Sequence, residues 1–408
     1  MKVFKKKQVY NTCRGCSNPN LFKFFSVKDL PMPEGHIVEH EEEYAQDLVV
    51  FFCKECFLVQ TQEDLDLDAY YKDYIYTPGN SAYANEFMKM TAEKLIELGY
   101  VKQDSHILEI GSGDGTQLVH FVNKGIAVTG VEPSTPLVKM SESVGVNTIE
   151  AMFNDELAET LISKDQRFDA VLIQYTFDHL TQPVSFLKQV RNLLTKEGVL
   201  LIEVHDFEKI LDRNEACLFT HEHSIYPSKD SLTKLLESYG FMVLEYDFIH
   251  EKASRGNSMI VVAGRSDSSW EKSELQLSER LLQMRNHETY EAFAQNIVVA
   301  HEKLRKYLED AVLEGKKIAG YGAAGRGVDT CVIAGVNAEL LTCIYDKNPS
   351  FQNKLTPISR IPVKEPKALF HDSPDELIVF SYGYLNEIKE YYSKFDGKIK
   401  SMLDIISN

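Results

Sequence analysis

A short apolar segment followed by a glycine-rich turn is the feature that most constrains the fold of this chain. Residues 107–110 (Ile-Leu-Glu-Ile) have the composition of a buried strand, and the turn Gly111-x-Gly113-x-Gly115 follows directly. Glycines at such a turn let the backbone approach a ligand where a side chain would collide. A second apolar run ends at Glu132, whose carboxylate can accept hydrogen bonds from ribose hydroxyls. Together these features predict a doubly wound α/β domain with a ligand site at the turn.

This pair of motifs resembles class I S-adenosylmethionine (SAM)-dependent methyltransferases. In that family the glycine turn, here Gly111 and Gly113, binds the methionine end of SAM, and the acid, here Glu132, binds the ribose. We assign Glu109 to the same cofactor site, with a surface acid at a strand end as the alternative. A dinucleotide site competes, but the spacing Gly111-x-Gly113-x-Gly115 departs from GxGxxG and favours SAM.

Hydrophobic periodicity divides the chain into three parts, with expected boundaries at 1–79, 80–265 and 266–408. The stretch 65–81 is rich in tyrosine, polar and broken by Pro-Gly, which predicts a loop. A helical segment at about 274–314 leads into a second, Rossmann-like α/β pattern. Strands are expected at 106–110, 127–132, 169–174, 198–204, 241–248, 259–263, 317–321, 341–345 and 376–380, and a helix at 82–98.

Four of the seven cysteines form two Cys-x-x-Cys pairs, Cys13/Cys16 and Cys53/Cys56. Each pair places two sulfurs on a tight turn, so that four thiolates can surround one tetrahedral Zn²⁺. A closed four-sulfur set leaves no open position for a substrate. The pairs therefore predict a structural zinc site, and a redox-active dithiol is the alternative.

A second glycine turn lies at residues 318–327, where a literal GxGxxG follows a strand and precedes a helix. Asp346 ends the next strand, which completes a dinucleotide fingerprint. Arg326 would place a cation beside a helix N-terminus, a combination suited to phosphate. Tight packing of a strand on a helix requires the same glycines, so the residues alone leave nucleotide binding and packing as equal alternatives.

Three titratable side chains occur in succession at His221, Glu222 and His223. In an extended stretch the two histidines would point one way and the glutamate the other. Histidine has an unperturbed pKa of about 6.5, which suits removal of a carbon-bound proton if the resulting enolate is stabilised. A metal-binding histidine pair and a surface segment before a helix are the alternatives.

Further polar candidates stand near predicted strand ends, where α/β folds place their ligands. His179 follows the third strand, and a helix-capping surface histidine is its alternative. Tyr74 and Tyr76 precede the α/β domain. The alternative for these two tyrosines is that they pack the loop onto the sheet.

The chain carries 44 Lys and Arg against 61 Asp and Glu, a formal net charge of −17. This balance argues against a nucleic-acid partner, because such affinity rests on cations that neutralise phosphates. No apolar stretch of signal-peptide or membrane-spanning length is present. We therefore expect a soluble, cytoplasmic protein without a membrane partner, either a monomer or a small homo-oligomer.

The order of these motifs resembles the three-part sugar C-methyltransferases along nearly the whole chain. That family transfers a methyl group from SAM to C3 of a nucleotide-linked 4-keto deoxysugar through an enolate. It carries an N-terminal zinc module, a central SAM domain and a C-terminal Rossmann-like domain that lacks a dinucleotide. The resemblance implies that the catalytic residues are His223 as base, Glu222, His179, Tyr74 and Tyr76. It also places Asn257, Tyr321 and Arg326 in the substrate site.

Departures from the family pattern bear on the substrate. Thr220 stands where a tyrosine is usual, and Asn257 where a glycine is usual. Loss of the tyrosine suggests an altered substrate or proton path. Alternatives are a SAM-dependent enzyme for another small molecule, an enzyme whose zinc module reads a macromolecule, and a non-catalytic scaffold. Acidic residues at 41–43 argue against the macromolecule reader.

Overall fold

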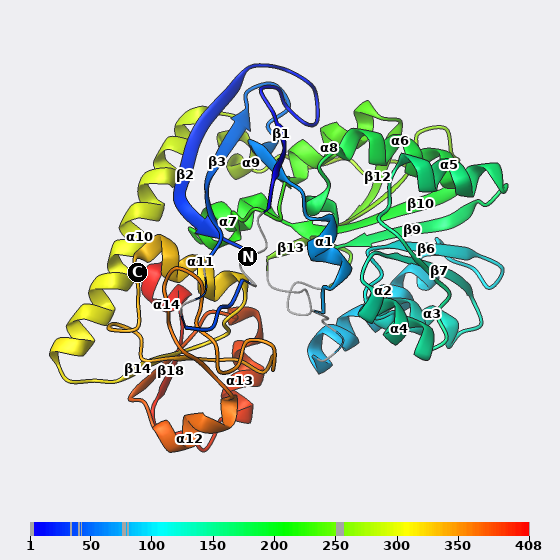
Figure 1. Ribbon diagram of the computed structural model, residues 1–408. Coiled ribbons are helices and arrows are strands. Elements are labelled where there is room, and N and C mark those ends of the chain that lie inside the picture. Colours follow the sequence, from blue (N-terminus) through cyan, green and yellow to red (C-terminus); the bar gives the residue numbers. More distant parts are fainter. Residues whose placement is uncertain are drawn as a thin grey trace.

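The computed structural model describes residues 4–32, 35–39, 41, 43–75, 79, 81–249 and 257–407. Figure 1 shows strands from the N-terminal region beside a central α/β layer, and a second α/β unit formed by the C-terminal region. No helix of the described residues combines the length and the apolar character that crossing a membrane requires.

Seven strands form the central sheet: β6 (His106–Ile110), β7 (Ala127–Glu132), β8 (Thr148–Glu150), β9 (Phe168–Gln174), β10 (Leu194–His205), β12 (Phe241–Tyr246) and β13 (Ser258–Arg265). Their order is β12-β13-β10-β9-β6-β7-β8. The strands from β8 to β10 are parallel, whereas β13 is antiparallel to both of its neighbours. This is the doubly wound α/β fold of class I methyltransferases that the sequence predicted. The short strand β8 was not among the expected strands, because none of its three residues is fully buried.

Helices cover both faces of this sheet (Figure 1). They are α2 (Ala82–Glu97), α3 (Thr116–Val122), α4 (Thr135–Ser143), α5 (Asp155–Ser163), α6 (Pro183–Leu193) and α8 (Lys229–Ser238). Apolar residues of α5, α6 and α8 pack on one face and those of α2 and α3 on the other. Serine side chains begin several of these helices. Ser81 accepts the backbone N–H of Ala84, and Ser228 with Ser231 forms a capping box, so these helices start where the sequence supplies an N-cap.

The N-terminal region forms a sheet that includes a strand from the central region. Strands β2 (Leu21–Pro31), β3 (Ala45–Cys53) and β4 (Val59–Thr61) are joined by β11 (Ile225–Tyr226), and β11 pairs with β4. A separate ribbon pairs β1 (Lys6–Val9) with β5 (Glu63–Leu65). Because β11 begins two residues after His223, this sheet helps to fix the position of the candidate catalytic residues.

The stretch 65–81 was predicted to be a loop, and this expectation is wrong for part of it. Helix α1 spans Asp68–Lys72. Tyr70 is buried in a small cluster with Met32, Leu65 and Leu67. Tertiary packing of this tyrosine therefore stabilises a helical turn that the polar composition did not indicate.

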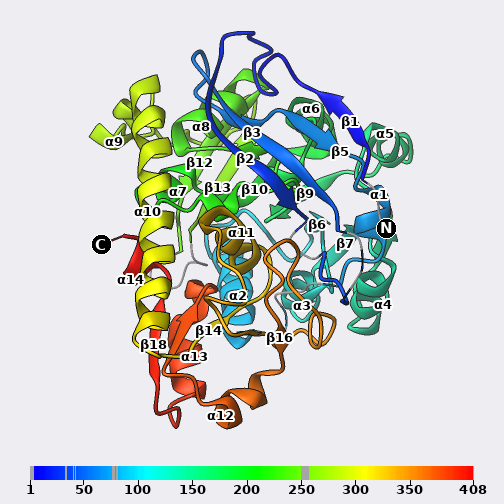
Figure 2. The same ribbon diagram turned by 60° about the vertical axis from the view of Figure 1, so that its left-hand side comes forward.

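The C-terminal region begins with helices α9 (Glu279–Gln283) and α10 (His287–Leu313). A parallel sheet follows, in the order β16-β15-β14-β17-β18. Its elements are β14 (Ile318–Tyr321), α11 (Gly325–Ala334), β15 (Ile344–Tyr345), β16 (Val363–Lys364), α12 (Leu369–Asp372), β17 (Glu376–Val379), α13 (Leu385–Tyr391), β18 (Lys398–Ser401) and α14 (Leu403–Ile406). Figure 2 shows α10 alongside both the N-terminal strands and this sheet. Apolar residues of α10 pack in the core of the N-terminal strands and in the core of the C-terminal sheet. The strands β16 and β18 were not predicted, since they are short and carry lysines.

Candidate active site

A cavity of about 400 Å³ opens at the carboxyl ends of β6, β7, β9 and β10. All three parts of the chain contribute to its walls. Tyr71 and Tyr74 precede the central sheet, the glycine turn lies between β6 and α3 of the central region, and Arg326 and Tyr384 belong to the C-terminal region. The cavity therefore joins the predicted cofactor turn to the predicted catalytic and substrate residues.

The glycine turn after β6 has room for a ligand. Gly111, Gly113 and Gly115 all have positive φ angles, of 72°, 54° and 80°, which side chains rarely adopt. A Cβ at Gly113 would meet no atom within 4 Å, so the backbone there faces open space. Gly113 and the buried Glu109 both line the cavity. These features fit the methionine end of SAM.

The carboxylate of Glu132 is held against this turn. Its Oε2 accepts the backbone N–H of Gly113 and its Oε1 that of Ser134, both at 2.9 Å. Burial raises the pKa of Glu132 above its ordinary value, although the two backbone N–H groups oppose this shift. Each carboxylate oxygen has a further lone pair, so Glu132 can accept ribose hydroxyls as well. The residues present therefore fit SAM.

The segment 221–223 is a turn rather than the extended stretch that was expected, and the predicted alternation of its side chains is wrong. The backbone N–H of His223 donates to the carbonyl of Thr220 and closes the turn. The Nε2 of His221 lies 3.0 Å from the carbonyl oxygen of Leu30, which places this ring against the N-terminal sheet. Glu222 and His223 both line the cavity. The two histidines therefore do not form one metal-binding pair.

The geometry of His223 leaves one ring nitrogen available as a base. Its Nδ1 lies 3.0 Å from the carbonyl oxygen of Leu218, which can only accept a hydrogen bond. Nδ1 therefore carries the proton in the neutral ring, and Nε2 carries the lone pair. The ring of His179 lies beside it, with centroids 4.8 Å apart.

His179 lines the cavity and is tied to the tyrosine-rich segment. Its Nδ1 lies 2.7 Å from the hydroxyl of Tyr71. Burial and, to a lesser extent, the neighbouring imidazole of His223 lower the pKa of His179 to about 3, so this ring is neutral at pH 7. Tyr74 lines the same cavity, whereas Tyr76 lies outside the described residues. Tyr71 was not among the predicted site residues, although it belongs to the same tyrosine-rich stretch.

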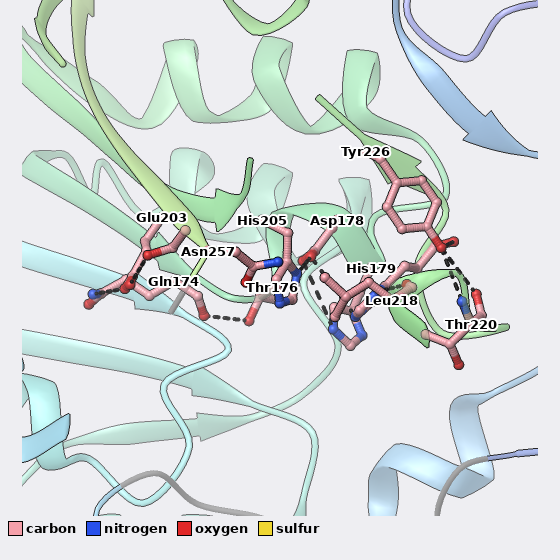
Figure 3. A network of polar contacts seen from close by, with 12 residues as sticks. Gln174, Thr176, Asp178, His179, Glu203, His205, Leu218, Thr220, Tyr226 and Asn257 are labelled. Atoms are coloured by element: carbon pink, nitrogen blue, oxygen red, sulfur yellow. Dashed lines mark hydrogen bonds and ion pairs between the residues drawn. The ribbon is translucent and has the colours of Figure 1, made fainter. Parts of the chain in front are cut away.

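Asp178 and His205 are two further site residues that the sequence motifs did not indicate. The Nδ1 of His205 lies 2.6 Å from Oδ2 of Asp178, and both residues are buried (Figure 3). His205 ends β10, and Asp178 adjoins the predicted His179. Both residues stand at the carboxyl ends of neighbouring strands, and such ends meet at one edge of the sheet. This placement could have identified them as candidate site residues.

Two of the three predicted substrate residues meet at the C-terminal side of the site. Arg326 lines the cavity, and its Nη2 donates to Oδ1 of Asn257 at 3.2 Å. The fully buried carboxylate of Glu215 accepts from Asn257 at 3.3 Å and lies 4.0 Å from Nε of Arg326. Tyr321 is not among the residues that line the cavity, and its ring packs against Tyr392 in the C-terminal core.

Close packing accounts for the second glycine turn. A Cβ at Gly327 would collide with the carbonyl oxygen of Gly322, and a Cβ at Gly322 would collide with the hydroxyl of Ser381. The carboxylate of Asp346 accepts the backbone N–H of Ala323 at 2.7 Å and so braces the turn. Of the two alternatives left by the sequence, these contacts favour packing.

The four paired cysteines converge at one point of the N-terminal region. The Sγ atoms of Cys13 and Cys56 are 3.4 Å apart, those of Cys16 and Cys53 are 3.6 Å apart, and all four lie within 4.8 Å of one another. Four thiolates at about 2.3 Å from a tetrahedral Zn²⁺ would be separated by nearly the same distances. The donor set and its spacing therefore fit zinc.

Comparison with known proteins agrees with this architecture. Residues 83–246 match a family model described as a methyltransferase domain, and residues 253–401 match one described as a C-methyltransferase C-terminal domain. The C-methyltransferase NovU of Streptomyces niveus is 26% identical over 94% of this chain and 92% of its own length. An O-methyltransferase of ubiquinone biosynthesis from Coxiella burnetii is 24% identical over 38% of this chain and 72% of its own. The solved magnesium protoporphyrin IX methyltransferase of Synechocystis, 13% identical, covers 50% of this chain and 98% of that one with a TM-score of 0.37.

The relative that spans nearly the whole chain and the C-terminal family model both belong to C-methyltransferases, and the central region matches a methyltransferase model. These matches indicate that the chain is a SAM-dependent C-methyltransferase, similar to NovU over nearly its whole length.

Proposed function

We propose that this enzyme transfers a methyl group from SAM to C3 of a nucleotide-linked 4-keto deoxysugar, with His223 as the base. One observation carries the proposal. A single cavity is lined by Gly113 of the cofactor turn, by His223 and by Arg326. The similarity to NovU supports a related reaction.

The reaction requires a base at C3 and stabilisation of charge at the C4 oxygen. A C3–H next to a ketone is acidic because its conjugate base is an enolate. In this proposal Nε2 of His223 removes the proton, and the electron pair moves into the enolate. Tyr74 and the neutral His179 face the same cavity and can donate hydrogen bonds to the developing oxyanion. SAM supplies an electrophilic methyl group when it is bound, and the shared cavity holds the two reactants in register.

Arg326 is proposed to bind the diphosphate of the nucleotide. A guanidinium can form paired hydrogen bonds to phosphate oxygens. Its contacts with Asn257 and Glu215 fix the direction of the side chain before the substrate arrives. The nucleotide would then lie toward the C-terminal region and the sugar toward His223.

We further propose that Cys13, Cys16, Cys53 and Cys56 hold a structural zinc ion. Cys53 ends β3, and the backbone N–H of Gly15 lies 3.4 Å from Sγ of Cys13, where it can donate to a thiolate. The ion would hold the end of the sheet that β11 joins, and β11 begins two residues after His223.

Deuterium exchange at C3 tests the base directly. The purified enzyme is incubated in D₂O, without SAM, with a panel of nucleotide-linked 4-keto-6-deoxysugars. We expect deuterium at C3 with the wild-type enzyme and a loss of more than about 100-fold in the exchange rate with His223→Asn. His221→Asn is the matched control, because this ring faces the N-terminal sheet. Undiminished exchange in His223→Asn, with SAM binding intact in both variants, would remove His223 from the role.

A further inference from the structure

Asp178 occupies the centre of the histidine cluster. It lies in the 3₁₀ turn η2 (Phe177–His179), directly after β9, and its side chain is 0% exposed. The backbone N–H of Ser224 donates to its carbonyl at 2.7 Å, which ties η2 to the segment that carries His223. Figure 3 shows the carboxylate beside the ring of His205. Neither the family motifs nor the proposed function assigns a role to this residue.

Three imidazoles surround this one carboxylate. Its Oδ2 lies 2.6 Å from Nδ1 of His205 and 3.9 Å from Nε2 of His223. Its Oδ1 lies 4.0 Å from Nε2 of His179 and has no hydrogen-bond partner among the described residues. The nitrogen of His223 nearest to Asp178 is therefore the same nitrogen that is free to take a proton.

The carboxylate is held in its ionised form at this position. Burial by itself would raise the pKa of Asp178, but the attraction of a protonated His223 and the hydrogen bond with Nδ1 of His205 outweigh this effect and lower it below its ordinary range. An anion within about 4 Å of an imidazole favours the imidazolium over the neutral ring, most strongly where water is excluded. A buried negative charge thus faces the atom on which positive charge would develop.

We propose that Asp178 is the positioning residue and counter-ion of the base: it stabilises His223 after that ring has taken the C3 proton, and His205 orients its carboxylate. The inference rests on the proposed function for the identity of the substrate. The C3–H bond breaks, its electron pair enters the enolate, and the proton moves to Nε2 of His223. The imidazolium forms an ion pair with Asp178 and later returns the proton to solvent.

Other charged or titratable groups face the same imidazole cluster and also affect the protonation of these rings. They come from different elements: the hydroxyl of Tyr71 in α1, the ring of His179 in η2, the carboxyl group of Glu222 in the 221–223 turn, and the guanidinium of Arg326 in α11. The positive charge of Arg326 disfavours a second positive charge on the imidazole of His223. A buried anion next to His223 would offset this repulsion.

The pH dependence of Asp178→Asn distinguishes this role from a structural one. The substitution keeps the shape and removes the charge. We expect kcat for methyl transfer to fall on the order of 100-fold, with a much smaller change in KM. The acid limb of the pH–rate profile should move to lower pH, because the imidazolium loses its counter-ion. Asp230→Asn is the control: this buried carboxylate pairs with Arg285 and is not among the residues that line the cavity.

His205→Leu gives a prediction of opposite sign. Removing the hydrogen bond from His205 leaves more negative charge on Oδ2 of Asp178, so the acid limb should move to higher pH than in the wild-type enzyme. An equal loss of kcat in both variants with an unmoved acid limb would overturn the proposal and make the cluster structural.

A second readout needs no substrate and therefore separates this inference from the proposed function. The nitrogen-15 signals of the imidazoles are followed against pH in the SAM-bound wild-type and Asp178→Asn proteins. A downward shift of the transition in the variant supports the proposal even if no sugar of the panel is methylated, and an unchanged transition overturns it. The ligating atoms of Asp178, His205 and His223 lie within 4.8 Å of one another. A stoichiometric divalent ion bound there, lost in Asp178→Asn and required for turnover, would also overturn it.

Discussion

The guanidinium of Arg326 in α11 donates a hydrogen bond to the side chain of Asn257, which immediately precedes β13, at 3.2 Å. This contact joins helix α11 of the C-terminal region to the residue before β13 of the seven-stranded sheet. Both residues approach Glu215, whose buried carboxylate also accepts from the hydroxyl of Tyr382. The proposed substrate side of the site is thus built from two regions that are far apart in the sequence.

Substitution of Arg326 should separate substrate binding from cofactor binding. We expect Arg326→Ala to raise KM for the nucleotide sugar at least about tenfold, because a charge-assisted contact with phosphate is worth roughly 1.5–3 kcal/mol. The dissociation constant for SAM, measured by calorimetry, should stay within about twofold. Arg326→Lys keeps the charge but loses the planar fork and should be intermediate. Equal weakening of SAM and sugar would contradict this assignment.

Glu215 should contribute a pH dependence to stability. Burial raises its pKa to about 7, from an ordinary value of 4.5. Between these values the unfolded chain loses the proton while the folded chain keeps it, so the contribution of Glu215 to folding stability falls as pH rises from about 4.5 to 7, by roughly 3 kcal/mol. Urea unfolding of wild type and Glu215→Gln from pH 5 to 8 measures this effect. The variant should lack that component, and parallel curves would count against it.

The open space at Gly113 can be tested with a matched glycine. Gly113 and Gly99 both have positive φ and open space at the Cβ position, but only Gly113 lines the cavity. Leucine at either position should cost a similar amount of stability, about 1 kcal/mol, because of the backbone conformation. Only Gly113→Leu should weaken SAM binding, by more than about tenfold. Equal SAM affinity in both variants would show that the turn does not contact the cofactor.

Zinc removal should disturb the active site through the shared sheet. We expect one zinc per chain by elemental analysis, and loss of the metal in Cys13→Ser. Thermal stability and the rate of methyl transfer should fall together. The reason is that β4 pairs with β11, the strand that comes shortly after His223 in the chain. Cys343→Ser is the control, since this buried thiol lies in the C-terminal core. Full activity of a zinc-free enzyme would contradict the structural role.

The local parts of this architecture were predictable from the sequence. The strands that end at Ile110 and Glu132 have the predicted bounds, because apolar runs bordered by glycines and turns carry that information locally. The Cys-x-x-Cys pairs also converge, as their spacing implied. The wider sheet order follows from the same alternation of strands and helices.

Contacts between distant segments were not predictable in this way. The direction of the His221 side chain depends on the carbonyl of Leu30, nearly two hundred residues earlier. The expected alternation of side chains in 221–223 was wrong because this segment is a turn and not a strand. Asp178 and His205 look like ordinary polar residues until the ends of β9 and β10 are brought side by side. Helix α1 forms in a polar stretch because Tyr70 is buried by residues outside it.

The position of the transferred methyl group is the direct test of methylation at C3 of the sugar. The wild-type enzyme is incubated with SAM carrying a carbon-13 methyl group and with the panel of nucleotide-linked 4-keto-6-deoxysugars, and the product is analysed by mass spectrometry and NMR. The account predicts a gain of one methyl group, bonded to C3 of the sugar. A methyl group on oxygen or on another carbon, or no transfer to any sugar of the panel by an enzyme that binds SAM, would contradict it.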